Sequence, residues 1–283
     1  MLYISIALYN DIIHSEDYTM KQLTLYQIDA FATSVFTGNP AGVCPLDTWL
    51  TDKQMQAIAE ENNLSETAFI VPENDHYRIR WFTPNTEVDL CGHATLASAF
   101  VLFNQLKHPG SAILFQSNSG ELRVSKHNNQ LQMDFPALPY QKITPTDEVL
   151  NALSIKPKEI YQSTFDLLCI FEQESDVRNI QLDLLAISQL KCRGIILSAP
   201  SSSGDVYSRC FYPACNVPED PVTGSAHCVI APYWCNRLDK TRIHAVQGLK
   251  RQGTLECEIK DNRVLLTGTC HMYMQGTIFI PSE

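Results

Sequence analysis

The chain has 283 residues, 45% hydrophobic and 18% charged, so it can form one large core or two medium-sized ones and is not of disordered composition. Its net charge of -10, from 21 basic and 31 acidic residues without a basic cluster, argues against a nucleic-acid partner. The ten cysteines show no CxxC pair or zinc-finger spacing, which predicts free thiols in a cytoplasmic protein without a metal centre.

The first 19 residues differ from the rest of the chain. Residues 1–10 are apolar, but they lack a preceding basic region and a following cleavage site, and they are too few to span a membrane. A clear strand pattern starts only at Met20. We therefore expect residues 1–19 to be a non-native or disordered extension, and we expect no membrane association.

Alternation of apolar and polar residues predicts a first strand over residues 23–31, followed by a turn over residues 36–42. Thr51 begins an amphipathic helix that ends near Asn63. Short surface helices are expected over residues 147–153 and 181–189. Further strands are expected at residue 43 and over residues 67–71, 77–82, 112–116, 121–125, 130–135, 194–199, 207–212, 255–259, 264–267 and 276–280.

Two further predicted helices carry no charged residue. They cover residues 93–106 (HATLASAFVLFNQL) and 225–236 (SAHCVIAPYWCN). A helix without a polar face is buried on all sides, and helices of this length are core helices rather than membrane spans. Two such helices in a strand-rich chain predict two sheet layers, each wrapped around its own helix.

The segments before these helices repeat each other. Residues 80–84 and 209–213 share the pattern R-x-F-x-P, and each is followed by an acidic residue, Gly-x-Ala and a charge-free helix. This indicates an internal duplication. We predict an α+β fold of two pseudo-equivalent domains, residues 20–134 and 135–271, each with a sheet layer wrapped around its own buried helix. The final strand, 272–283, is a candidate to return to the first domain.

Gly92 and Gly224 open the two buried helices. The first N–H groups of a helix are unpaired and lie at its positive pole, so two such ends across a cleft would bind a carboxylate or a phosphate. The alternative is that both glycines only permit tight helix packing, and the sequence leaves both readings open.

Polar side chains surround these two helix starts, but they match none of the common catalytic motifs. A hydrolase is disfavoured because residues 223–227 (TGSAH) lack the G-x-S-x-G pattern. Cys91, His93, His227 and Cys228 lack a familiar metal-ligand spacing. Nucleotide-binding motifs are also missing. We therefore expect neither a metal nor a cofactor.

Three segments in this part of the chain resemble the signatures of the PhzF-like family of phenazine biosynthesis. They are residues 63–69 (NLSETAF), 89–95 (DLCGHAT) and 219–227 (EDPVTGSAH), and FTGNPAG at residues 36–42 also fits. The resemblance implies the diaminopimelate epimerase-like fold, in which each of the two domains is a rolled β-sheet or barrel around a central buried helix, in agreement with the duplication. It also implies a cofactor-independent isomerase that moves a proton on a small, carboxylate-bearing metabolite. We expect a cytoplasmic homodimer.

The resemblance further implies the roles of the site residues. Glu66 would carry the proton, and His93 and Asp220 would assist it. A partly buried glutamate suits this role because burial raises its pKa towards neutrality. The substrate would be held by residues at the two helix starts, namely Gly92, Ala94, Gly224 and Ser225.

Two alternatives remain beside this hypothesis. Racemases of this fold place a cysteine before each helix glycine, whereas this chain has Cys91 and Thr223 there. A threonine hydroxyl is too weak an acid to replace a thiol, which disfavours a cysteine-based racemase. The other alternative is a non-catalytic member that binds a small ligand or a protein.

Overall fold

The computed structural model describes residues 20–282, so the expected extension at residues 1–19 lies outside the described residues. The α-helices are α1 (Asp52–Asn62), α2 (Gly92–Asn104), α3 (Asp147–Asn151), α4 (Glu174–Asn179), α5 (Leu184–Ser188) and α6 (Gly224–Leu238). The strands of the first half are β1 (Met20–Ala30), β2 (Asn39–Pro45), β3 (Glu66–Glu73), β4 (His76–Phe82), β5 (Glu87–Val88), β6 (Ala112–Ser117), β7 (Gly120–His127) and β8 (Gln130–Pro136). Those that follow are β9 (Tyr140–Ile143), β10 (Glu159–Ser163), β11 (Asp166–Ile170), β12 (Gly194–Pro200), β13 (Val206–Tyr212), β14 (Val217–Asp220), β15 (Arg242–Gln247), β16 (Gly253–Lys260), β17 (Arg263–Gly268) and β18 (Cys270–Pro281).

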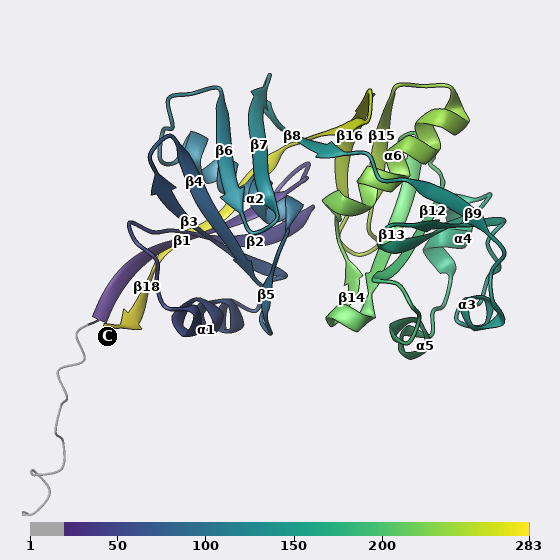
Figure 1. Ribbon diagram of the computed structural model, residues 1–283, viewed down its shortest axis with the longest axis horizontal. Helices are drawn as coiled ribbons and strands as arrows, with labels where there is room; N and C mark the ends of the chain where they lie inside the picture. The colour runs from purple at the N-terminus through teal and green to yellow at the C-terminus, as the bar shows by residue number, and fades with distance from the viewer. Residues whose placement is uncertain (1–19, 283) are drawn as a thin grey trace, which may run out of the picture.

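The two halves of the chain have the same topology and lie side by side (Figure 1). In the first half, β1 and β2 are antiparallel, β2 and β3 parallel, β3 and β4 antiparallel, and β4 and β6 parallel. The second half repeats this order with β10, β11, β12, β13 and β15. β8 and β17 pair with each other and join the two halves. The α+β duplication predicted from the sequence is thus present in the strand order.

α2 and α6 are the central helices of the two halves. Ten residues of each are buried, and α2 contacts β1, β2, β3, β7 and β8, while α6 contacts β11, β15, β16 and β17. Because neither helix has a charged face, each can be surrounded by the apolar side of a rolled sheet. In the part of the chain that the structure describes, no helix is long and apolar enough to cross a membrane.

The arginines of the repeated R-x-F-x-P pattern make the same contact in both halves. Arg80 Nε donates to Glu87 Oε1 at 2.7 Å, and Arg209 Nε donates to Glu219 Oε1 at 2.8 Å. Each pair has a second, parallel N–H···O bond, which gives the bidentate geometry that suits guanidinium and carboxylate. These ion pairs tie β5 to β4 and β14 to β13, and β5 and β14 are the short strands that lead into the two central helices.

The final strand starts earlier than the sequence predicts. β18 pairs with β1 from Cys270–Ala30 to Pro281–Met20, whereas the strand pattern is clear only over residues 276–280. Its counterpart β9 pairs with β10 in the second half. The expected division after residue 134 falls inside β8, which ends at Pro136, and the domain boundaries stay a prediction.

Candidate active site between the two halves

The starts of α2 and α6 lie against each other. A Cβ atom added to Gly92 would be 3.6 Å from the Gly224 Cα atom, which is an ordinary van der Waals distance. Both glycines line one cavity of about 240 Å³. Neither residue has a positive φ, so the glycines serve the close approach of the two helix ends rather than a special backbone conformation.

The first turns of both helices are open towards this cavity. The N-cap residues, Cys91 and Thr223, make no side-chain hydrogen bond to the helix N–H groups. These N–H groups and the positive ends of two helix dipoles favour a negatively charged ligand. The structure therefore places the two predicted anion-binding ends at a single site.

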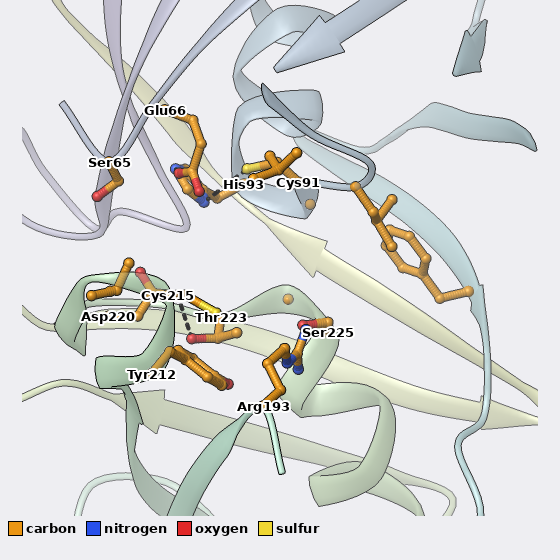
Figure 2. A pocket seen from close by; sticks show the side chains of 16 residues that line it. Ser65, Glu66, Cys91, His93, Arg193, Tyr212, Cys215, Asp220, Thr223 and Ser225 are labelled. Atoms are coloured by element: carbon orange, nitrogen blue, oxygen red, sulfur yellow. Dashed lines mark hydrogen bonds and ion pairs between the residues drawn. The ribbon is translucent and has the colours of Figure 1, made fainter. Parts of the chain in front are cut away.

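Glu66 is the first residue of β3 and points into the cavity from the N-terminal half (Figure 2). Burial, reinforced by the negative charge of Asp220, raises the pKa of the Glu66 carboxyl from 4.5 to about 8. A hydrogen bond with the Cys91 thiol opposes this rise. Glu66 is therefore mostly protonated at neutral pH, and the fraction that is ionised can act as a base.

His93 is a titratable neighbour of Glu66. Its Nε2 atom lies 3.2 Å from Glu66 Oε2, and burial lowers the pKa of the imidazole to about 3. The contact is thus between a neutral acid and a neutral ring, not an ion pair, and it is not aligned as a hydrogen bond. The Nδ1 atom lies 3.3 Å from Asn39 Nδ2, an amide nitrogen that can only donate, and this favours the tautomer with the proton on Nε2.

Asp220 ends β14 on the opposite side of the cavity. Its carboxylate accepts hydrogen bonds from Asn39 Nδ2 at 2.7 Å and from Thr223 Oγ1 at 2.5 Å. Burial raises the pKa of Asp220 to about 6, although both hydrogen bonds act against this. Because Asn39 lies in β2, its amide ties the two halves of the site together.

Gln247, at the end of β15, is fully buried behind the start of α6. Its amide nitrogen donates to the Asp220 backbone carbonyl at 2.9 Å and to Thr223 Oγ1 at 3.0 Å, while its oxygen accepts from the Thr223 backbone N–H at 3.0 Å. These bonds orient the Thr223 hydroxyl towards Asp220. Gln247 is a positioning residue that the sequence did not indicate.

The structure brings together six of the seven residues predicted for the site. The residues that line the cavity are Glu66, Gly92, His93, Asp220, Gly224 and Ser225. Ala94, expected to bind substrate, does not line it. Its methyl group is fully buried inside the first turn of α2, where it packs in the core. The predicted contact of Ala94 with substrate stays a prediction, and only its backbone could make that contact.

Several other residues line the cavity and were not predicted. Arg193 and Tyr212 belong to the second half, and Ser65 precedes Glu66 in the first. The apolar part of the wall consists of Val88, Leu90, Phe135 and Val217. Ser65 and Tyr212 lie in or beside the quoted motifs and could have been found there, whereas an isolated arginine before a strand carries no such signal.

Glu66, Cys91 and His93 also have donor atoms within 4.8 Å of one another, an arrangement in which a metal could be considered. Burial raises the pKa of the Cys91 thiol well above its usual value of 9.0, so both this thiol and Glu66 carry protons at neutral pH. A metal would have to displace both protons. The expectation of a metal-free site stays a prediction.

Comparison with known proteins agrees with this fold. The family model described as "Phenazine biosynthesis-like protein" matches residues 28–276. A Pseudomonas aeruginosa protein named as an uncharacterized isomerase is 49% identical and aligned over 92% of this chain and 100% of its own length. A crystal structure of a PhzF-family protein from Enterococcus faecalis superimposes with a TM-score of 0.89 at 44% identity, covering 92% of this chain and 100% of that one.

A more distant structure shows how widely the fold is shared. The hydroxyproline epimerase of Agrobacterium vitis superimposes with a TM-score of 0.59 at 8% identity, over 92% of this chain and 93% of its own. At this identity the similarity concerns the fold alone. The duplicated epimerase-type fold, the matching family model and the isomerase relatives together show that this chain belongs to the phenazine biosynthesis-like (PhzF) family and is an enzyme of the isomerase class.

Proposed function

We propose that the protein isomerises a small, carboxylate-bearing metabolite without a cofactor, with Glu66 as the acid/base. The observation that carries the proposal is the Glu66 carboxyl, with its pKa raised to about 8, in a cavity formed by two open helix starts. A group with a pKa near neutrality can both accept and donate a proton at ordinary pH. Permanent anion-binding groups beside it would hold the acidic substrate.

The proposed reaction is a proton transfer that conserves all atoms. The ionised Glu66 removes a proton from one carbon of the substrate, the electron pair of that C–H bond moves into the adjacent unsaturated system, and protonated Glu66 returns the proton at another carbon. The negative charge that develops is stabilised by the N–H groups of α2 and α6. His93 would orient the Glu66 carboxyl, and Asp220, held by Asn39 and Thr223, would orient the substrate.

We also propose a cytoplasmic homodimer. All ten cysteines are free thiols, as a reducing compartment requires. β18 pairs with β1 along one edge, and the exposed large apolar residues near it are Phe36, Met272, Tyr273, Met274 and Phe279. An exposed apolar strand of this kind favours association with a second copy.

The function is tested by NMR in deuterated water with a panel of cyclic and amino carboxylic acids. We expect one class of acid to gain deuterium at carbon or to change into an isomer in the presence of the wild-type protein. Glu66→Gln serves as the control for contaminating enzymes, because it should abolish the exchange. A protein that binds acids from the panel without any exchange would instead support the non-catalytic alternative.

Cys91 provides a test against a cysteine mechanism. Its thiol is buried and protonated, and its counterpart in the second half is Thr223, so Cys91→Ser should retain most of the isomerase activity. We also expect no labelling of Cys91 by iodoacetamide at pH 7, measured by mass spectrometry of the native protein. Rapid labelling together with complete loss of activity in Cys91→Ser would contradict the glutamate mechanism.

A further inference from the structure

The internal duplication shows which residue of the second half corresponds to Glu66. Glu66 pairs with Ala41 at the start of the parallel β2–β3 ladder, and Gly194 pairs with Asp166 at the start of the parallel β11–β12 ladder. The neighbouring antiparallel ladders agree, because Thr67 lies opposite Phe82 and Ile195 lies opposite Phe211 of the repeated pattern. Gly194 is therefore the counterpart of Glu66, and Arg193 is the counterpart of Ser65.

The second half cannot carry a carboxylate at this position. A Cβ atom at Gly194 would lie 2.2 Å from the Phe211 carbonyl oxygen and 2.3 Å from the Tyr212 ring. Tyr212 occupies the space that a side chain would need, and its buried hydroxyl has no hydrogen-bond partner among the described residues. The corresponding positions on the two sides of the cavity thus differ in chemistry. Glu66 stands on one side, and Gly194, preceded by Arg193, stands on the other, where Asp220 also lies.

Arg193 is held in place by a buried acid and two rings. Its Nε and Nη2 atoms donate to Asp166 Oδ1 at 2.9 Å and Oδ2 at 2.5 Å, and Asp166 is 1% exposed. The guanidinium carbon lies 5.0 Å from the Tyr212 ring centre and 5.3 Å from that of Phe165. Over residues 20–282, no hydrogen bond engages the Nη1 atom. The guanidinium is therefore fixed in orientation while keeping N–H donors for a ligand.

Arg193 is also the single permanently cationic side chain among the described residues that line the cavity. Figure 2 shows it with Ser225 on the wall formed by the C-terminal half, while Glu66, Cys91 and His93 lie on the other wall. A carboxylate accepts charge-assisted hydrogen bonds from arginine more strongly than from neutral donors. The start of α6, on the same wall, favours the same charge.

We propose that Arg193 binds the carboxylate of the substrate and so sets its orientation, with the carboxylate on the C-terminal wall and the carbon that exchanges its proton facing Glu66. This inference rests on the proposed function for the reacting carbon, but the binding role of Arg193 can be tested alone. The ligand is then a monocarboxylate with an apolar body, which suits the wall of Val88, Leu90, Phe135 and Val217.

The test measures binding of benzoate and of benzamide by titration calorimetry and NMR. We expect Arg193→Gln to bind benzoate about 10- to 100-fold more weakly than the wild-type protein, because a charge-assisted hydrogen bond is lost. The affinity for benzamide, which has no charge, should fall much less in this variant. Benzoate binding tests this inference, whereas deuterium exchange by the wild-type protein tests the catalytic proposal, so a failure of one and a failure of the other give different results.

Two further variants control for folding and for net charge. Removing Arg193 alone leaves Asp166 buried and unpaired, so the double variant Arg193→Gln/Asp166→Asn keeps a neutral pair and should show the same loss of benzoate binding. Arg178→Gln removes an arginine of equal exposure, 33%, outside the cavity, and should bind benzoate normally. Saturable benzoate binding that is equal in wild type and the double variant, or no benzoate binding by the wild type, would overturn the proposal.

Discussion

Glu66→Gln should lower the isomerase turnover by at least about 100-fold while leaving the protein folded. Glutamine has nearly the same shape as glutamic acid, the form in which Glu66 is mostly present at neutral pH, so the cavity should not change. The amide cannot accept a proton from carbon at any ordinary pH, so the exchange step is lost. Turnover is measured with the acid identified by deuterium exchange, and folding by circular dichroism.

Glu73→Gln is the matched control for this substitution. Glu73 is the last residue of β3, is exposed and does not line the cavity, so the same chemical change on the same strand should leave turnover unaffected. A near-normal rate in Glu66→Gln would show that another group moves the proton. The neighbours that could do so are His93 and Asp220.

The fold was predictable because its strongest sequence signals are local. The charge-free segments that became α2 and α6 could be read from composition alone, and the R-x-F-x-P repeat marked the two arginines that make equivalent ion pairs. Strands such as β10 and β11 were missed because their short apolar runs are equally compatible with a buried helix. The full length of β18 is set by its pairing with β1, about 250 residues away in sequence.

The site was predictable only in part, because its contacts are between distant segments. Glu66 alone looks like a surface carboxylate at the start of a strand, and only the family resemblance indicated its role. Asn39 reaches Asp220 across 181 residues, and no local pattern shows that contact. Arg193 likewise looks like a cation in a loop. Only the strand register shows that it is the counterpart of Ser65 in the duplication.

The raised pKa of Glu66 also predicts a pH-dependent cost in stability. The unfolded chain ionises this carboxyl near its ordinary value of 4.5, whereas the folded protein keeps the proton until about pH 8. Between these values the unfolded state binds fewer protons than the folded state, so rising pH favours unfolding. The contribution of Glu66 to stability is thus intact below pH 4.5 and is lost progressively as the pH rises to about 8.

Glu66→Gln removes this titration, so the variant should become more stable relative to the wild-type protein as the pH rises. Each pH unit corresponds to about 1.4 kcal/mol, and the whole window therefore gives roughly 3–5 kcal/mol in favour of the variant. The measurement is the free energy of urea unfolding of both proteins at pH 4.5, 6.5 and 8, at constant ionic strength. Because Asp220, with its pKa of about 6, is present in both proteins, most of its contribution cancels in the difference. A difference that stays constant over this range would mean that the Glu66 pKa is not raised, and Glu66 would then be a poor proton donor at neutral pH.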